Sequence, residues 1–121
     1  SDMSVGRDSS LLLIVDDWEA LERYEERLSF HFTELEACPM PQEGLQRAGE
    51  RAWDRILLDL VLEDVAPAEA VARLKEDPRS SRIPLVVVGA AEELADLDLD
   101  FPDRRVHRPF QWAALVEQLI S

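Results

Sequence analysis

The sequence predicts an α/β fold, a doubly wound five-stranded parallel sheet with helices on both faces. Five short apolar runs alternate along the chain with five stretches that carry helical spacing or helix-start signals. Three of the runs are almost continuously apolar, which is typical of strands buried on both faces of a parallel sheet. Right-handed crossovers between successive strands would then place helices on both sides of one sheet.

The five predicted strands differ in how deeply we expect them to be buried. The first, third and fourth contain the runs Leu-Leu-Leu-Ile-Val, Ile-Leu-Leu and Ile-Pro-Leu-Val-Val-Val, which are typical of strands covered on both faces. The second carries glutamates, which favours an edge position, and the fifth is short and polar. The predicted strands cover residues 11–15, 33–38, 55–60, 83–88 and 105–107.

The predicted helices depend on spacing and on start and stop signals. Leu21, Tyr24 and Leu28 fall on one face at helical spacing, and Asp17 is a suitable N-cap before them. A proline opens the second helix, and an Asp-Pro pair ends the third. The fourth should be short. The predicted helices cover residues 18–30, 41–50, 67–76, 91–97 and 111–120.

Length and composition indicate one domain in a reducing compartment. The chain has 121 residues, 46% of them hydrophobic, which is enough for one domain with a full core. We assign residues 10–121 to that domain and residues 1–9 to a disordered or tag-derived N-terminus. The single cysteine, Cys38, cannot form an internal disulfide, which favours the cytoplasm. No apolar run approaches the roughly 18 residues of a membrane span.

Charge is the most unusual bulk property. The chain has 26 acidic residues against 13 lysines and arginines, a formal net charge of −13. Such a surface repels phosphate backbones and anionic lipids, so we expect neither direct nucleic-acid binding nor membrane binding. The simplest interpretation of the acidity is a well-solvated surface.

Three aspartates follow two of the predicted strands. Asp16 and Asp17 come directly after the first, and Asp59 ends the third. Because ligand sites in such sheets lie at the carboxyl ends of the strands, we expect these carboxylates to meet at one edge. Their repulsion would require bound protons or a hard cation, and Mg²⁺ prefers carboxylate, carbonyl and water oxygens. The alternative is structural: Asp17 caps a helix and Asp59 is a turn residue.

The remaining strand ends carry small and basic residues. Gly89 and Ala90 follow the fourth strand, where their backbone N–H groups could face an anion. An ordinary strand-to-helix turn is the alternative interpretation of this pair. Arg108 follows the fifth strand, directly before Pro109, and is expected to direct a cation toward the acidic edge.

Taken in order, these motifs resemble the receiver domains of bacterial response regulators, over nearly all of residues 11–120. The motifs are Leu-Ile-Val-Asp-Asp, Ile-Leu-Leu-Asp-Leu, Ile-Pro-Leu-Val-Val-Val and Arg-Pro-Phe. The resemblance implies a flavodoxin-like fold, with Asp59 as the phosphoacceptor for a histidine kinase or phosphotransfer protein. It also implies Mg²⁺ bound by Asp16, Asp17, Asp59 and the backbone carbonyl of Val61. The phosphate pocket would be lined by Arg108, Gly89 and Ala90.

The chain departs from that family at several positions. Gly89 stands where a serine or threonine usually ends the fourth strand, and Arg105 stands at the switch position, where an aromatic residue is usual. Arg108 replaces the usual lysine, keeping its charge but not its geometry. A neutral hydrogen bond contributes only about 1 kcal/mol net, so loss of the hydroxyl need not abolish phosphorylation. Since the hydroxyl and the ring carry the readout in the family, we expect either another signalling route or no switch.

Three functions remain open on this evidence. The first is a phosphorylatable receiver domain that regulates a partner or a fused output domain. The second is a pseudo-receiver, a protein-interaction module that works without phosphorylation. The third is another flavodoxin-like protein, such as a small phosphatase or flavin binder, although Val61 stands where an aspartate-type phosphatase would have a second acid. Beyond self-phosphorylation on Asp59 we expect no enzymatic activity.

The resemblance also indicates a surface for partners. In the family the fourth helix, fifth strand and fifth helix commonly form a dimer or output face, and mixed charges there could pair across a two-fold axis. A homodimer through this face is one expected assembly, of either a stand-alone regulator or a part of a longer protein. The residues on this predicted face include Glu92, Glu93, Asp96, Arg104, Arg105 and Trp112.

Overall fold

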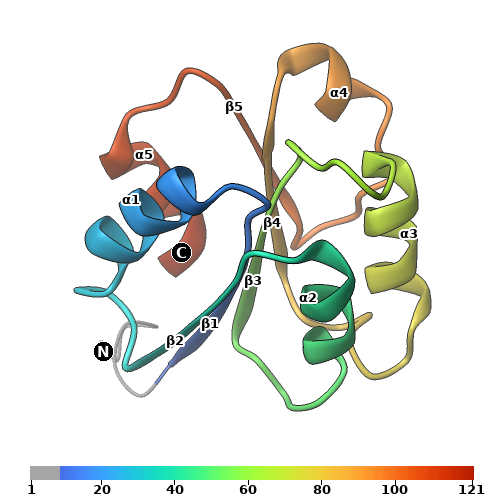
Figure 1. Cartoon of the computed structure of the whole chain (residues 1–121), viewed down its shortest axis with the longest axis horizontal. Coiled ribbons are helices and arrows are strands. Elements are labelled where there is room, and N and C mark those ends of the chain that lie inside the picture. Colours follow the sequence, from blue (N-terminus) through green and yellow to red (C-terminus); the bar gives the residue numbers. More distant parts are fainter. Residues whose placement is uncertain (1–8) are drawn as a thin grey trace.

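The computed structural model describes residues 9–121 and shows a five-stranded parallel sheet between two layers of helices (Figure 1). The strand order is β2-β1-β3-β4-β5, so the predicted fold class is confirmed. Strands and helices alternate along the chain. Their bounds are β1 (Ser10–Ile14), α1 (Trp18–Leu28), β2 (Glu34–Cys38), α2 (Pro41–Ala48), β3 (Arg55–Asp59), α3 (Pro67–Glu76), β4 (Leu85–Gly89), α4 (Ala91–Ala95), β5 (Arg104–His107) and α5 (Trp112–Ile120).

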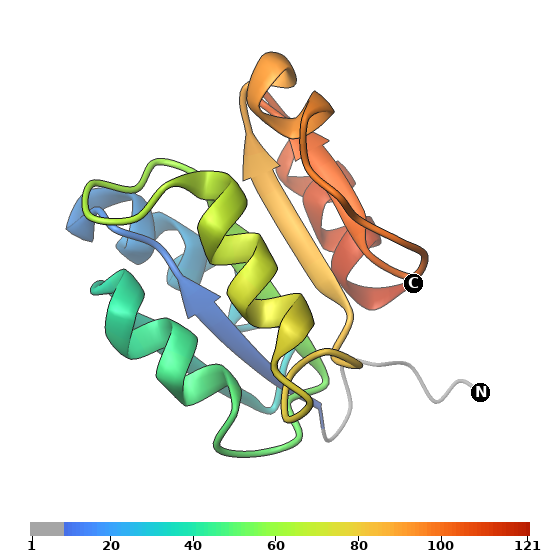
Figure 2. The ribbon, with the colours of Figure 1, turned by 90° about the vertical axis from the view of Figure 1, so that its right-hand side faces the viewer.

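The two layers of helices bury opposite faces of the sheet. α1 and α5 cover one face, and α2, α3 and α4 cover the other; Figure 2 shows α2 and α3 in front of the strands. Successive side chains of a strand point to opposite faces, so Leu13 packs with α1 and α5 whereas Ile14 packs on the side of α2. Every residue of β1 and β4 is buried, which explains their apolar composition.

The edges of the sheet are its more polar strands. β2 lies at one edge beside β1, as its glutamates predict, and Glu34 and Glu36 form ion pairs with Arg51 and Arg47. β5 lies at the other edge beside β4, and Val106 is the buried residue of that strand. Each edge strand therefore buries less than the three central strands do.

Some predicted boundaries differ from the structure by one or two residues. β4 begins at Leu85 rather than at 83, because the N–H of Ile83 closes a turn onto the carbonyl of Ser80 at 3.0 Å and the intervening proline has no N–H. α4 has five residues and ends before 97, where the N–H of Leu97 turns back to the carbonyl of Leu94 at 3.3 Å. Helix four is therefore short, as predicted.

The predicted N-terminal segment, residues 1–9, lies outside the described residues except for Ser9. Ser9 is buried, and its carbonyl accepts a hydrogen bond of 3.1 Å from the N–H of Glu34. Ser9, the last residue of that predicted segment, is therefore hydrogen-bonded to the start of β2.

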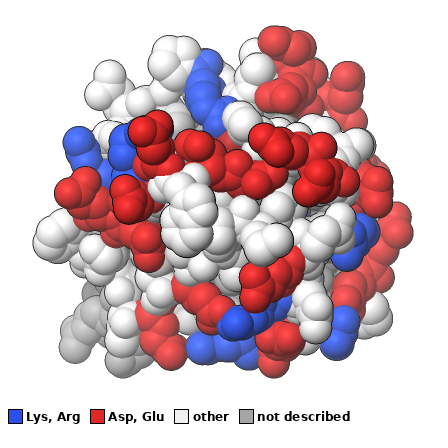
Figure 3. Space-filling view, viewed as in Figure 1, with Lys and Arg blue, Asp and Glu red and all other residues white. Residues whose placement is uncertain are grey.

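Acidic side chains cover much of the face drawn in Figure 3, where lysines and arginines form smaller groups. This distribution agrees with the formal net charge of −13. None of the helices between residues 9 and 121 is long and apolar enough to cross a bilayer.

Candidate functional site

The predicted site residues come from the carboxyl ends of four neighbouring strands, β1, β3, β4 and β5. Because the strands are parallel, the segments after β1 and β5 and the end of β3 meet at the carboxyl edge. They surround a cavity of about 290 Å³. Residues that line it include Asp16, Asp17, Arg23, Asp59, Val61 and Arg108.

Asp59 ends β3, and only 2% of the residue is exposed. Its Oδ1 accepts hydrogen bonds from Nη2 of Arg108 and from the backbone N–H of Val61, the latter 3.0 Å long. Its Oδ2 accepts a hydrogen bond of 2.8 Å from the hydroxyl of Tyr24. An ionised carboxylate can only accept hydrogen bonds, and a buried charge requires such partners. The three donors therefore suit Asp59 in its charged form.

Arg108 connects Asp59 to the end of β4. Its backbone N–H donates to the carbonyl of Gly89 at 2.9 Å, and its guanidinium forms the ion pair with Asp59. Partial burial disfavours the charged guanidinium, but the hydrogen bond and negative charge of Asp59 outweigh that effect and raise the pKa of Arg108. The cation at the acidic edge is thus in the position that the sequence predicts.

Asp16 and Asp17 each accept a backbone hydrogen bond with one carboxylate oxygen. Oδ2 of Asp16 accepts from the N–H of Glu63 at 3.0 Å, which ties the segment after β1 to the segment after β3. Oδ2 of Asp17 accepts from the N–H of Ala20 at 2.9 Å, so Asp17 is the N-cap of α1, as its position predicts. Within residues 9–121, neither carboxylate has a hydrogen bond to its other oxygen.

The donor atoms at this edge fit Mg²⁺ in kind. Asp16, Asp17, Asp59 and Val61 line one cavity and offer the carboxylate and carbonyl oxygens that Mg²⁺ prefers. In the described part of the chain, however, no three acidic, histidine or cysteine side chains are gathered closely enough to hold a metal ion.

The end of β4 is closely packed around Gly89. A Cβ atom at this position would lie 2.7 Å from Cδ1 of Leu60 and 3.1 Å from Oε1 of Glu93. The same Glu93 oxygen accepts from the N–H of Ala90 at 2.9 Å. The space beside Gly89 is thus filled by Leu60 and Glu93, and the amide of Ala90 already has an acceptor.

Arg105, at the predicted switch position, joins β5 to the end of α4. Its Nε donates to the carbonyl of Leu94 at 2.9 Å, and its Nη2 donates to the carbonyl of Leu97 at 2.6 Å. These carbonyls lie in the last turn of α4 and just after it, where a helix leaves its acceptors unpaired. Arg105 therefore attaches the short helix to the edge strand.

Sequence reasoning treated Tyr24 as a core residue, and the structure places its hydroxyl on the phosphoacceptor candidate. The ring is part of the buried stripe of α1, as the helical spacing predicts. Burial, together with the negative charge of Asp59, raises the pKa of Tyr24 well above its ordinary range. The available signal was chemical: a tyrosine between Leu21 and Leu28 on an apolar face needs a partner for its hydroxyl.

The ring of Tyr24 also belongs to an aromatic trio with Phe110 and Trp112. Ring centroids are 6.4 Å apart for Tyr24 and Phe110, 5.6 Å for Tyr24 and Trp112, and 5.2 Å for Phe110 and Trp112. The guanidinium of Arg27 lies 5.3 Å from the Trp112 ring centroid, which suits a cation–π contact. The trio therefore joins the middle of α1 to the start of α5, next to Asp59.

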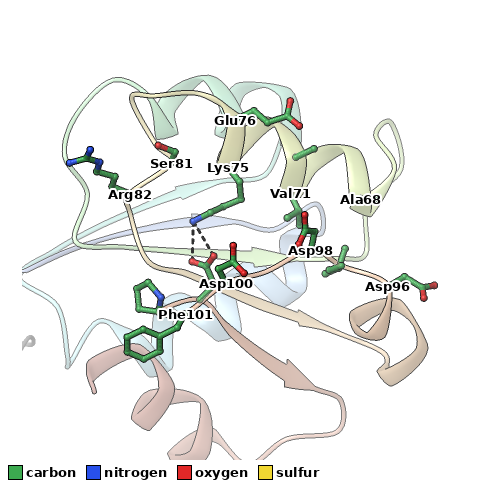
Figure 4. A pocket seen from close by; sticks show the side chains of 14 residues that line it. Ala68, Val71, Lys75, Glu76, Ser81, Arg82, Asp96, Asp98, Asp100 and Phe101 are labelled. Carbon is green, nitrogen blue, oxygen red and sulfur yellow. Dashed lines mark hydrogen bonds and ion pairs between the residues drawn. The ribbon is translucent and has the colours of Figure 1, made fainter.

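A second, larger cavity of about 520 Å³ lies between α3 and the segment that joins α4 to β5 (Figure 4). Across it, Nζ of Lys75 reaches Asp103, 3.0 Å from Oδ2 and 3.1 Å from Oδ1. None of the predicted phosphoacceptor, metal or phosphate-pocket residues lines this cavity. It is therefore separate from the site around Asp59.

Comparisons with known proteins identify the fold. No protein-family model and no curated protein matches the chain. Among solved structures, the chemotaxis protein CheY4 of Vibrio cholerae is similar, with a TM-score of 0.75, 16% identity, and coverage of 93% of this chain and 96% of that chain. The receiver domain of the sensor histidine kinase PA1611 from Pseudomonas aeruginosa, described with a magnesium ion in its active site cleft, gives a TM-score of 0.78 at 18% identity, covering 93% and 94%.

A third similar structure is the CheY-like response regulator receiver domain from Methylobacillus flagellatus. It has a TM-score of 0.73 at 19% identity, and the alignment covers 93% of this chain and 98% of that one. The three structures are alike in architecture and differ from this chain at most positions of the sequence. The chain therefore has the fold of CheY-like receiver domains.

Proposed function

We propose that the chain is a receiver domain of two-component signal transduction in which Asp59 accepts a phosphoryl group. The observation that carries this proposal is a buried carboxylate, Asp59, paired with Arg108 in a cavity that Asp16 and Asp17 also line. A nucleophilic carboxylate beside a cation suits an incoming group that carries negative charge, since the cation stabilises the charge that develops in transfer.

The transfer is a displacement at phosphorus. An oxygen of Asp59 forms a new bond to phosphorus while the bond from phosphorus to the donor's leaving atom breaks. With acetyl phosphate as donor, acetate leaves and the total charge is unchanged. Arg108 is placed to neutralise charge on the phosphoryl oxygens. When bound, Mg²⁺ would supply further positive charge there, held by Asp16, Asp17, Asp59 and the carbonyl of Val61.

The donor of the phosphoryl group would be another protein in the cytoplasm. We infer a histidine kinase or phosphotransfer protein as donor, and an output partner or a fused domain as the target. The similar structures support this inference, because they include receiver domains of two histidine kinases. The homodimer through α4, β5 and α5 stays a prediction; on that face Arg105 already donates to two carbonyls of its own chain.

Intact-mass measurement with acetyl phosphate and Mg²⁺ tests the proposal. The wild-type chain should gain the mass of one phosphoryl group, and Asp59→Asn should gain none. Asp64→Asn is the matched control, because it removes an exposed carboxylate five positions along the chain and should be labelled like the wild type. An unlabelled wild type, under conditions that label an ordinary receiver domain, would disprove the proposal.

A second candidate is a pseudo-receiver, a docking module that works without a phosphorylation switch. The side of the site formed by β4, α4 and β5 favours it, since Arg105 holds the end of α4 and Leu60 and Glu93 fill the space beside Gly89. Cellular activity distinguishes the candidates. A pseudo-receiver should keep its activity in Asp59→Asn, whereas a phosphorylated receiver should lose it with its fold intact.

A further inference from the structure

Tyr24 is the only tyrosine of the chain, and its hydroxyl lies inside the site. The residue is 3% exposed, comes from the middle of α1, and donates to Oδ2 of Asp59 at 2.8 Å. Its neighbours on the buried stripe of α1, Leu21 and Leu28, have no polar group. A buried phenol hydroxyl needs a hydrogen-bond partner, and Asp59 is that partner.

The two oxygens of Asp59 differ in what an attack on phosphorus would displace. Oδ1 receives a guanidinium and a backbone N–H, whereas Oδ2 receives the neutral phenol of Tyr24. Attack through Oδ1 would disturb the ion pair with Arg108, and ion pairs inside a protein are costly to break. Attack through Oδ2 disturbs one neutral donor, so Oδ2 is the oxygen that we expect to form the bond to phosphorus.

A phosphoryl group on Oδ2 would occupy the position that the Tyr24 hydroxyl now faces. Phosphoryl oxygens are strong hydrogen-bond acceptors, and a buried hydroxyl without a partner costs about 1–3 kcal/mol. The hydroxyl would therefore donate to a phosphoryl oxygen, at a different place from Oδ2. Since the hydroxyl is rigidly attached to its ring, the ring of Tyr24 must shift with it.

A shift of that ring would change the packing at the start of α5. Phe110 and Trp112 both pack on Tyr24, with ring centroids 6.4 Å and 5.6 Å away. On the opposite side of the site, Arg105 holds the end of α4, and Leu60 and Glu93 fill the space beside Gly89.

We propose that Tyr24 is a positioning residue that holds Oδ2 of Asp59 before phosphoryl transfer, donates to the phosphoryl group afterwards, and passes the change to Trp112. One side chain thereby supplies both a hydroxyl and a ring on the α1 and α5 side of the sheet. The phosphorylation step rests on the proposed function. The link from Asp59 through Tyr24 to Trp112 does not.

The three tryptophan indole N–H signals in ¹⁵N-labelled protein provide the test. Trp112 belongs to the trio, Trp18 is 67% exposed beside Asp17, and Trp53 is buried on the opposite face of the sheet. The spectra to compare are those of wild type, Tyr24→Phe, Asp59→Asn and the double variant, without a phosphodonor. In the chain that keeps Tyr24, Asp59→Asn should shift the Trp112 signal. In the chain that carries Tyr24→Phe, the same substitution should shift that signal far less. The Trp53 signal should be unchanged in both.

Acetyl phosphate and Mg²⁺ are then added to wild type and Tyr24→Phe, with the extent of labelling read by intact mass. We expect labelling rates within about fivefold of each other, because the lost hydrogen bond is worth about 1 kcal/mol. The Trp112 signal should move only in the wild type. Ser80→Ala is the control, since it deletes another buried hydroxyl, bonded to the carbonyl of Leu74 at 2.7 Å, and should leave the Trp112 response intact.

The outcomes separate the two proposals. The role of Tyr24 is overturned if Asp59→Asn does not shift the Trp112 signal, or shifts it equally in the wild-type and Tyr24→Phe backgrounds. A chain that is never labelled, but in which Asp59→Asn shifts Trp112 through Tyr24, overturns the proposed phosphorylation and retains the link between Asp59 and α5. If Tyr24→Phe unfolds, the comparison of Asp59→Asn with wild type still decides whether Trp112 senses Asp59.

Discussion

The site has two sides that differ in how they are built. On the side of α1 and α5, the buried Asp59 contacts Arg108 and Tyr24, and aromatic rings continue the contact toward α5. On the side of β4 and α4, Arg105 holds backbone carbonyls and Leu60 fills the space at Gly89. On the α1 and α5 side, a bound group could change the charge of Asp59. The β4 and α4 side is held by contacts that do not involve Asp59. The charge of Asp59 and the aromatic contacts toward α5 thus lie together on one side of the site.

Stability should show the difference between the sides most strongly. Arg108→Gln leaves the Asp59 carboxylate, 3% exposed, without its cation, so we expect the free energy of unfolding to fall by about 2–3 kcal/mol. Arg105→Gln removes donors to neutral backbone carbonyls at an exposed position, where water can replace the lost donors. We therefore expect the free energy of unfolding to fall by at most about 1 kcal/mol. Urea unfolding measures both. Equal losses would contradict the division of the site into two sides.

Gly89→Ser tests whether the second side can be given a hydroxyl. The new Cβ would lie 2.7 Å from Cδ1 of Leu60, so a well-packed region must shift, and we expect a loss of about 1 kcal/mol in the free energy of unfolding. Leu60→Val in the same chain removes the nearest atom and should make the serine less costly. If Gly89→Ser does not lower the free energy of unfolding while Leu60 is present, the packing on this side adjusts more easily than the structure implies.

Magnesium should affect only the first side. Trp18 is exposed directly after Asp17, so Mg²⁺ bound at the acidic edge should change its fluorescence. Asp16→Asn should abolish the change, because it removes a proposed ligand. Removal of Mg²⁺ by a chelator should reverse the change in the wild type. A response that survives Asp16→Asn would place the ion elsewhere.

Cys38 belongs to neither side, and its titration should have no effect on stability at neutral pH. Burial, with the nearby negative charges of Glu43 and Glu50, raises the pKa of its thiol to about 11. The folded chain therefore keeps the proton that the unfolded chain releases above about pH 8.5. Stability should be unaffected by this thiol below pH 8.5 and should decrease as the pH rises toward 11.

Urea unfolding at pH 7 and pH 10, in wild type and Cys38→Ala, checks this sign. The wild type should lose more stability than the variant between the two pH values. At pH 8 the thiol should react with a disulfide reagent only slowly, because it is buried and protonated. Fast reaction would show that β2 opens locally.

The sequence predicts the strands and the acidic edge of this molecule better than it predicts the contacts within the site. Continuous apolar runs predicted β1 and β3 because strands covered on both faces leave little choice of residue. Asp59 and Arg108 could be placed together because parallel strands end at one edge. Helical spacing, by contrast, records only that Tyr24 faces inward, and says nothing of where its hydroxyl points.

Contacts made by loops could not be predicted from the sequence either. The bond from the N–H of Glu63 to Asp16 depends on how two segments after different strands meet, and neither segment has a periodic pattern. The attachment of Arg105 to Leu94 and Leu97 depends on the early end of α4, which the sequence left uncertain by two residues. Such contacts are set by the tertiary structure rather than by local preference.

The two edge strands of the sheet carry charges of opposite sign. β2 presents Glu34 and Glu36, and β5 presents Arg104 and Arg105. Two β2 edges brought together would place carboxylates against carboxylates, and two β5 edges would place guanidinium groups against each other. Like charges along each edge strand therefore disfavour the pairing of that edge with the same edge of a second copy.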